Sequence, residues 1–260
     1  MAQFSYHCTA LEGSNKAGTL KPDGDGYYEV VLGALNYFNT RGEFYALEPA
    51  KHLFGSSGIL MRKVKSGNLK GEEGHPRFQP GMTKADFLYR LMDTYEPNVC
   101  MHIAEVGLDD KRVKDKNGES IVAIMGRVKG SGPHGEAFDR SMTNAKENMC
   151  FSLRAVTDDF KDKAGTVIRV IKEIYTWDRV NEGGIRPANK YNSPALEDLM
   201  SMDFDMGHLK MTRNLALSMS GGLESDTIQA INQTMTSLGW TGDTVTTTAS
   251  GIILPPSMRW

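Results

Sequence analysis

The sequence has few cysteines and no long apolar run. Its three cysteines are Cys8, Cys100 and Cys150, and none belongs to a CxxC pair or to a Cys/His cluster of the kind that a structural zinc site needs. A small, odd and scattered set of thiols is typical of a reducing compartment. No stretch approaches the roughly eighteen apolar residues of a membrane-spanning helix, and the N-terminal residues lack a basic segment followed by an apolar one. We therefore expect neither export nor insertion into a membrane.

An excess of charge of one sign is also missing. The chain has 30 Lys and Arg residues against 32 Asp and Glu residues, a formal net charge of -2. This balance creates no overall attraction to a phosphate backbone, so we expect no dedicated nucleic-acid binding. Hydrophobic residues make up 40% and charged residues 24%, which are ordinary values for a folded globular chain. With 260 residues, one main domain can bury a core without disulfides.

The common enzyme motifs are absent as well. The chain contains no GxxxxGK phosphate loop followed by Ser or Thr, no HExxH helix and no GxSxG around a serine. What remains is a distributed set of residues: His75 in GEEGHP, Ser152 in CFSLRA and Asp178 in IYTWDRV. Successive members are 77 and 26 residues apart, so only the fold can bring them together.

The spacing of apolar residues predicts a mixed chain of strands and helices. The predicted strands cover residues 27–38, 99–110, 121–130, 150–157 and 166–180. Helices are predicted near Pro49 and over residues 85–95 and 136–149. Asn117 and Gly118 predict a tight turn that makes residues 99–130 a hairpin. His75, directly before Pro76, is expected in a loop or at a strand end.

The two ends of the chain differ from its middle. Residues 1–26 end in the turn-forming cluster KPDGDG, and we interpret them as an N-terminal arm or lead-in. Residues 27–190 would form the main domain, and residues 191–260 a helical or irregular C-terminal tail that can be detached. Met200, Met202, Met206 and Met211 are expected to form an adaptable apolar helix face that docks to a scaffold lattice or to a second copy.

Serine, histidine and aspartate together can perform nucleophilic catalysis. A serine hydroxyl is a weak nucleophile until a nearby imidazole takes its proton, and an acidic partner fixes the imidazole tautomer and stabilises the cation that forms. The order of these residues along a chain is free. These residue types are common, however, so composition alone favours solvated or capping roles for Ser152, His75 and Asp178.

The segments around these residues resemble a known family. They are YYEVVLGALNYFNTRGEFYALEPAKHLF, LKGEEGHP, VAIMGRVKGSGPHGEAFDRSMTNAKENMCFSLRA and IKEIYTWDRVNEGG. In order and approximate spacing over about residues 27–190, they resemble the prohead core (head-maturation) serine protease of tailed bacteriophages with myophage-type heads. They are more distantly similar to the assemblin protease of herpesviruses. Leu153, Ala155 and the segment Asn39-Thr40-Arg41 depart from the family pattern.

Carried over residue by residue, the resemblance implies a catalytic triad. Ser152 would be the nucleophile, His75 the general base and Asp178 the orienting acid. Arg154, two residues after the nucleophile on the same side of a strand, would support the oxyanion. Neither a metal nor an organic cofactor is implied. The implied fold is an α+β domain, a mostly antiparallel β-barrel core surrounded by helices as in herpesvirus assemblin.

The implied function is endoproteolysis inside the immature phage head, within the host cytoplasm. The expected substrates are scaffold or core proteins and capsid proteins, and the herpesvirus comparison implies a homodimer. Release of the tail would involve self-cleavage near residues 221–225. Two other functions stay open: a catalytically silent structural protein of the head core with the same fold, and a hydrolase of small esters.

Alternative roles for single residues also stay open. His75 could cap a turn, Ser152 could bind a strand carbonyl, and Asp178 could pair with Arg179 or Arg169, which would leave Glu173 as the acid. A metal site could form from His75 with Glu72 and Glu73, although adjacent glutamates on a strand point to opposite faces. His102 is interpreted as a histidine of the sheet face, and His134 as an exposed turn residue.

Overall fold

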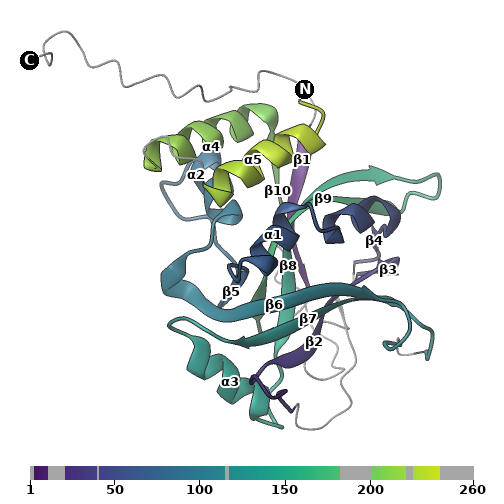
Figure 1. Cartoon of the computed structure of the whole chain (residues 1–260). Coiled ribbons are helices and arrows are strands. Elements are labelled where there is room, and N and C mark those ends of the chain that lie inside the picture. Colours follow the sequence, from purple (N-terminus) through teal and green to yellow (C-terminus); the bar gives the residue numbers. More distant parts are fainter. Residues whose placement is uncertain are drawn as a thin grey trace, which may run out of the picture.

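The computed structural model describes residues 3–10, 21–39, 41–114, 117–181, 201–220 and 225–240. These residues form two sheets, in which all strand pairs but one are antiparallel, and five α-helices (Figure 1). The α+β class expected from the sequence is therefore confirmed. Within these ranges, no helix is both long enough and apolar enough to cross a lipid bilayer.

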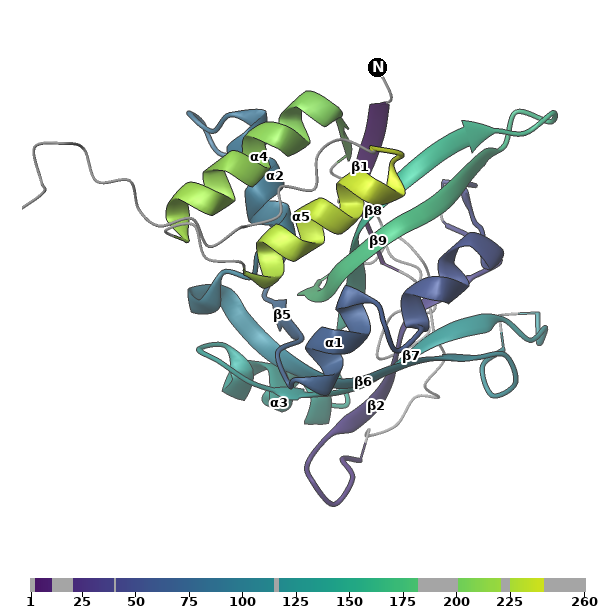
Figure 2. The ribbon, with the colours of Figure 1, turned by 45° about the horizontal axis from the view of Figure 1, so that its top comes forward.

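The larger sheet has six strands in the order β10-β1-β8-β9-β4-β3. Their bounds are Ser201–Asp205 (β10), Gln3–Ala10 (β1), Cys150–Lys161 (β8), Val167–Val180 (β9), Phe44–Tyr45 (β4) and Tyr37–Phe38 (β3). β8 and β9 form a long antiparallel hairpin that dominates this sheet (Figure 2). β8 continues to Lys161, beyond the end at residue 157 that the sequence predicts, so the connection to β9 is shorter than expected.

The smaller sheet has the order β2-β7-β6-β5. Its strands are Tyr28–Leu35 (β2), Val122–Gly130 (β7), Val99–Asp109 (β6) and Lys70–Glu72 (β5). β6 and β7 form the hairpin predicted from the sequence, and Gly118 in its connection has a φ of 83°, a backbone conformation that favours glycine. β5 is a short edge strand, and the chain continues from it to His75.

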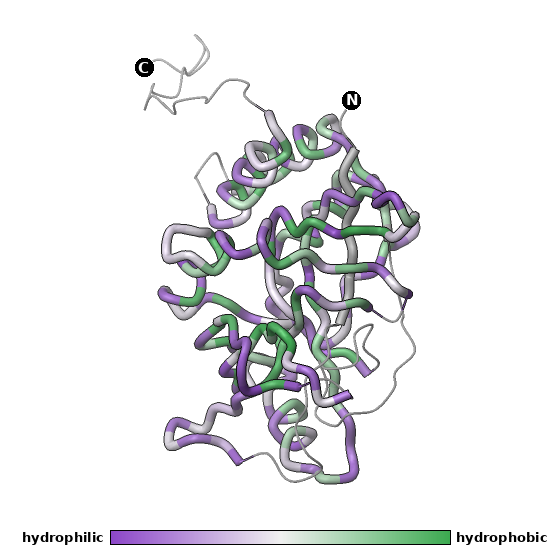
Figure 3. The backbone as a smooth tube through the Cα atoms, turned by 90° about the vertical axis from the view of Figure 1, so that its right-hand side faces the viewer, coloured by the Kyte–Doolittle hydropathy of each residue, from purple (hydrophilic) through white to green (hydrophobic). Residues whose placement is uncertain are grey.

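The two sheets pack around one hydrophobic core, but their strands do not form a closed barrel. Buried side chains of both sheets, including Leu32, Ile103, Leu153 and Trp177, belong to the same cluster. Figure 3 shows hydrophobic colour along the inner strands and hydrophilic colour at the protruding turns. A parallel bridge from Glu73 to Arg179 links the end of β5 to β9, but strand pairing among the described residues closes no barrel. The barrel that the resemblance implied is therefore not found among these residues.

Helices cover the sheets on several sides. They are the 3-10 helices η1 (Glu48–Phe54) and η2 (Glu96–Asn98), and the α-helices α1 (Ile59–Lys65), α2 (Lys84–Met92), α3 (Gly135–Thr143), α4 (Met206–Met219) and α5 (Asp226–Ser237). The helix predicted near Pro49 is η1, with Leu53 buried. The helix predicted to reach Met149 ends at Thr143, because Asn144 is extended and its side chain accepts from the amide of Lys146, which makes a turn.

The N-terminal arm predicted for residues 1–26 includes a strand. β1 lies between β10 and β8 and is antiparallel to both. Its sequence QFSYHCTA alternates polar and apolar residues, which is the period of a strand. This segment is part of the sheet and not only a lead-in, because β10 and β8 pair with its two sides. Residues 11–20 and Thr40 lie outside the described residues.

The C-terminal region packs on the main domain. α2, α4 and α5 lie side by side (Figures 1 and 2), and residues of all three share a second hydrophobic cluster. The expected methionine helix face is wrong, because Met202 lies in strand β10 and Met206 begins α4, while Met211 is exposed. Met200, residues 182–200 and most of the expected cleavage stretch at 221–225 lie outside the described residues.

Candidate active site

Two of the sequence-predicted site residues face each other across the central hairpin. Ser152 on β8 and Asp178 on β9 are partners in the antiparallel register. Ser152 is 2% exposed and Asp178 is fully buried. Phe151 and Leu153 flank Ser152, and Trp177 precedes Asp178. These apolar side chains are buried, so both strands carry the polar pair into the core.

His75 reaches this pair because β5 runs close beside β9. The hydroxyl of Thr176 donates to the carbonyl of Lys70 at 2.6 Å, and the amide of Gly74 donates to the carbonyl of Arg179 at 2.7 Å. Gly74 has a φ of 73°, which only glycine adopts easily. The chain therefore turns directly after β5 and places the next residue, His75, beside the hairpin.

The three side chains form a continuous hydrogen-bonded chain. Nδ1 of His75 lies 2.9 Å from Oδ2 of Asp178, and Nε2 of His75 lies 2.5 Å from Oγ of Ser152. An ionised carboxylate only accepts hydrogen bonds, so Nδ1 carries the proton and donates to Asp178. The lone pair of Nε2 is then directed at the hydroxyl of Ser152. This arrangement can remove a proton from that hydroxyl.

The carboxylate of Asp178 is held from several sides. The backbone amide of Glu72 donates to Oδ1 at 3.1 Å, and the guanidinium of Arg154 donates to both oxygens, at 2.6 and 3.0 Å. Burial raises the pKa of Asp178, but the charge of Arg154 and the hydrogen bond from His75 outweigh burial and hold the pKa below its usual value. Asp178 is therefore ionised at neutral pH.

Arg154 is placed differently from the oxyanion role expected for it. Its side chain is 1% exposed and donates to Asp178, to Glu72 at 3.0 Å and to the carbonyl of Asp93 at 3.0 Å. Nε and Nη2 donate to the two oxygens of Asp178, which is bidentate recognition of that carboxylate. The geometry thus favours support of the acid over contact with a substrate oxygen.

Two charged residues of this region were missed at the sequence level. Glu72 is fully buried and pairs with Arg90 of α2 as well as with Arg154. From the sequence, Glu72 was considered only as a metal ligand, and Arg90 not at all. Two features of the sequence could have indicated this pair. One is the acidic residue three positions before His75, and the other is the single basic residue in the last turn of α2.

The other candidates lie elsewhere. Arg169 pairs with Glu43 and Arg179 with Glu73, so neither is the partner of Asp178. Glu173 binds Gln233 of α5, and the imidazole of His75 pairs with Asp178 instead.

Two other histidines considered from the sequence, His102 and His134, have different surroundings. His102 lies on β6, where its Nδ1 is 2.9 Å from the hydroxyl of Tyr27, in agreement with a sheet-face histidine. His134 is at the start of α3 and half-buried, in a turn as expected but less exposed.

The alternative metal site is not assembled. The carboxylate of Glu72 faces Arg90 and Arg154, and that of Glu73 faces Arg179. Arginine beside a carboxylate occupies the oxygens that a cation would need. Across the described ranges, no group of three or more His, Cys, Asp or Glu side chains could hold a metal ion.

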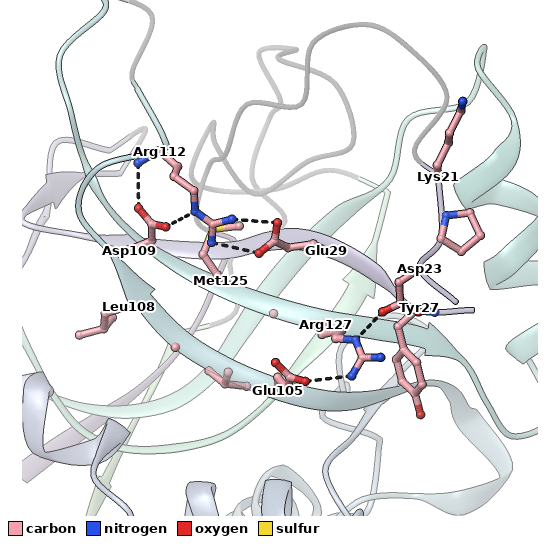
Figure 4. Close-up of a pocket in the computed structure, with 14 residues that line it drawn as sticks. Lys21, Asp23, Tyr27, Glu29, Glu105, Leu108, Asp109, Arg112, Met125 and Arg127 are labelled. Atoms are coloured by element: carbon pink, nitrogen blue, oxygen red, sulfur yellow. Dashed lines mark hydrogen bonds and ion pairs between the residues drawn. The ribbon is translucent and has the colours of Figure 1, made fainter. Parts of the chain in front are cut away.

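A separate surface pocket of about 490 Å³ lies on the smaller sheet (Figure 4). Its walls come from β2, β6, β7 and residues 21–27, and neither Ser152, His75 nor Asp178 lines it. Most of its charged groups are paired with one another: Arg112 with Glu29 and Asp109, and Arg127 with Asp23 and Glu105. This pocket is therefore distinct from the Ser-His-Asp group.

Comparisons with known proteins agree with a protease. The model of the Peptidase S80 family matches residues 6–238, and the chain belongs to this family. It is 37% identical over 238 residues to the capsid maturation protease of Pseudomonas phage phiKZ, which covers 88% of this chain and 86% of that protein. The chain is thus a protease of a family that includes phage capsid maturation enzymes. The resemblance stated from the sequence is confirmed at this level.

One solved structure is also similar. The capsid assembly protease of bacteriophage T4 superimposes with a TM-score of 0.44 and 12% identity, over 69% of this chain and 99% of that one.

Proposed function

We propose that this protease is a serine endopeptidase with Ser152 as nucleophile, His75 as general base and general acid, and Asp178 as the orienting acid. The observation that carries the proposal is the continuous contact from Oγ of Ser152 through the imidazole of His75 to the buried carboxylate of Asp178. Arg154 takes the role of a positioning residue for Asp178 rather than an oxyanion donor.

The reaction follows from these contacts. Nε2 of His75 accepts the hydroxyl proton while Oγ of Ser152 attacks a peptide carbonyl, and the imidazolium is stabilised by Asp178. The imidazolium then protonates the leaving amine, which leaves an ester of Ser152. The same imidazole takes a proton from a water that attacks this ester, and the imidazolium then returns a proton to Oγ of Ser152 as the C–O ester bond breaks and the second product leaves. Only side chains and water take part.

Access to the nucleophile requires a local opening. Ser152 is 2% exposed and the side chain of His75 is 13% exposed. A peptide carbonyl reaches Oγ only after neighbouring groups move. A closed resting state suits an enzyme that is enclosed with its substrates before it acts.

The proposed substrates are the scaffold or core proteins and the capsid proteins of a phage. The name of the phiKZ relative supports this proposal, since that protein is a capsid maturation protease. The proposed location is the immature head in the host cytoplasm. A homodimer and self-cleavage near residues 221–225 remain predictions from the family resemblance.

A small fluorophosphonate tests the proposal directly. Such a probe phosphonylates a serine that a neighbouring base activates, and peptide mapping identifies which serine reacts. We expect one equivalent of label on Ser152 and none in Ser152→Ala. Labelling of another serine, or of none in folded protein, contradicts the assignment.

The same variant tests the substrates. In phage-infected cells, Ser152→Ala should accumulate uncut scaffold and capsid proteins, whereas Ser66→Ala, which removes an exposed hydroxyl at the end of α1, should not. Normal processing with Ser152→Ala would instead support a structural protein of the head core. Turnover of activated esters by a protein that cuts no capsid peptide would support a small-ester hydrolase.

A further inference from the structure

We propose that Glu72 and Arg90 are a positioning pair that holds Asp178 through Arg154 and balances the buried charge around the triad. The inference rests on the proposed function, because it assigns a role relative to His75 and Ser152. It concerns residues that touch neither a substrate nor the reacting atoms. Four observations carry it: the contacts of Glu72, its connection to Asp178, its place in the chain and the charge balance.

Glu72 has an unusually complete set of donors. Its carboxylate is fully buried and accepts from both terminal nitrogens of Arg90, one of them at 2.9 Å. It also accepts from Arg154 at 3.0 Å, from the amide of Tyr95 at 3.0 Å and from the side-chain amide of Asn98 at 3.4 Å. A carboxylate that accepts this many hydrogen bonds is fixed in position.

The guanidinium of Arg154 joins Glu72 to Asp178. One terminal nitrogen, Nη2, donates to Oε1 of Glu72 and to Oδ1 of Asp178. Glu72 therefore sets the place of the arginine, and the arginine sets the place of the acid. Glu72 also acts through its backbone, because its own amide donates to Oδ1 of Asp178 at 3.1 Å.

The chain position of Glu72 couples the acid to the base. Glu72 ends β5, and His75 follows three residues later. Anchoring of the Glu72 side chain by α2 thus fixes the start of the segment that presents the imidazole. One residue holds Asp178 through Arg154 and holds His75 through the chain.

The charges of this group balance. Two carboxylates, Glu72 and Asp178, meet two guanidinium groups, Arg90 and Arg154, and only Arg90 reaches the surface, with 21% of its side chain exposed. The imidazolium that forms at His75 during the reaction adds a positive charge to this buried group. Loss of the negative charge of Glu72 disfavours that imidazolium, and loss of the positive charge of Arg90 favours it.

Other titratable groups face this cluster from the surrounding elements. They are Glu73 and Arg179 at the β5–β9 bridge, Cys100 on β6 and Lys63 on α1. Burial raises the pKa of the Cys100 thiol, and burial lowers the pKa of Lys63. These groups are the same in the variants below, so a change in pH dependence reports the charge that was removed.

The test is the pH dependence of phosphonylation of Ser152. The second-order rate constant for a small fluorophosphonate is measured by intact mass from about pH 5 to about pH 9. The acidic limb of this pH profile reports the fraction of His75 with an unprotonated imidazole. We expect Glu72→Gln to move this limb to lower pH and Arg90→Gln to move it to higher pH, each on the order of one pH unit. The double variant should return the limb close to its original position.

The plateau rate gives a second readout. Glu72→Gln should lower it roughly tenfold to a hundredfold, the cost of one lost charge-assisted hydrogen bond. Glu105→Gln is the matched control, because Glu105 also pairs with an arginine at 2.9 Å but lies on the exposed face of the smaller sheet. It should leave both the limb and the plateau unchanged.

The outcomes separate the two proposals. Absence of label on Ser152 in the wild-type protein overturns both. If the wild-type protein is labelled but the acidic limb does not move in the variants, the positioning pair alone is overturned. The same holds if the limb moves in the same direction in both single variants. If Glu72→Gln does not fold, Arg90→Gln decides by itself, because Arg90 is partly exposed and its loss leaves Glu72 with other donors.

Discussion

The Cα of Gly71 lies against the backbone carbonyl of Trp177, so close that an added Cβ would overlap the carbonyl oxygen and the side chain of Met101. This contact brings β5 beside β9 and thereby sets His75 beside Asp178. The distance between His75 and Asp178 thus depends on a residue without a side chain.

Gly71→Ala should separate the two strands. We expect a loss of about 1–3 kcal/mol in the free energy of unfolding, as for an overpacked core, and a large fall in the labelling rate of Ser152. Urea unfolding and the fluorophosphonate assay measure the two effects. Gly107→Ala is the control, since an added Cβ there meets nothing within 4 Å. Equal behaviour of the two variants would contradict the packing argument.

Asp178→Asn tests the orienting acid. The amide cannot hold the same imidazole tautomer, and we expect a fall in the rate of roughly ten-thousandfold with the fold retained. The rate of peptide or activated-ester cleavage measures it, and circular dichroism checks the fold. Asp158→Asn, which alters an exposed partner of Lys172, should retain the wild-type rate. A fall of only a fewfold for Asp178→Asn would remove this residue from the triad.

Arg154→Met tests the placement of this arginine. Its loss leaves two buried carboxylates without their shared cation, so we expect about 3–5 kcal/mol of destabilisation in urea unfolding. Arg127→Met removes a half-buried arginine that also makes several ion pairs, and its unfolding midpoint should change little. Wild-type stability in Arg154→Met, combined with a lower rate, would instead favour an oxyanion role.

Glu173 predicts a pH dependence of stability. Burial raises its pKa from 4.5 to about 7, against the hydrogen bond from Gln233, which lowers it. The folded protein therefore binds a proton that the unfolded chain releases, and stability falls as pH rises from about 4.5 to about 7. The size is roughly 3 kcal/mol.

Glu173→Gln should remove this loss. We expect the variant to be more stable than the wild type at about pH 8 and similar at about pH 4, where the carboxyl is protonated in both states. Urea unfolding at the two pH values measures the difference. A wild-type stability that is constant across this range, or that rises with pH, would contradict the burial argument.

Truncation tests which part of the C-terminal region is detachable. A chain that ends after residue 240 keeps α4 and α5, and we expect it to fold and to label normally. A chain that ends after residue 200 loses Phe204, Leu209 and Ile231 from the second hydrophobic cluster, and it also loses the hydrogen bond from Thr227 to Asp93. It should unfold at lower urea concentration and label slowly. Unchanged behaviour would show that the region from residue 201 onward is dispensable.

The sequence predicted the middle of this fold well, because that part repeats simple periods. β2, β6, β7 and most of β8 and β9 are runs of apolar or β-branched residues between clear turns, and α2 has the spacing of one buried helix face. These patterns are local, so they can be seen without knowing the partners of each strand.

The two ends of the chain were harder to predict, because their structure depends on partners that are distant in the sequence. β1 is central only because β8 and β10 lie on its two sides, and neither partner is visible from its own eight residues. β10 was hidden in a methionine-rich segment that also suits a helix. Its pairing with β1 makes five residues extended before α4 begins.

The candidate site was likewise predictable only in part. The family resemblance led to Ser152, His75 and Asp178, and the structure brings these three together. The resemblance could not lead to Glu72 and Arg90, because an ion pair between a short strand and a helix has no sequence motif. The placement of Arg154 depends on this pair, and for that reason the sequence alone suggested a different role for it.

The hairpin of β8 and β9 also determines when activity can first arise during synthesis. The ribosome completes the imidazole-bearing segment early, the hydroxyl 77 residues later and the opposing carboxylate last. A nascent chain that has not yet emerged as far as residue 178 holds the proposed base and nucleophile but not the proposed acid that would align them. Under the proposed mechanism, proteolysis can therefore begin only after nearly the whole of residues 27–190 has been made.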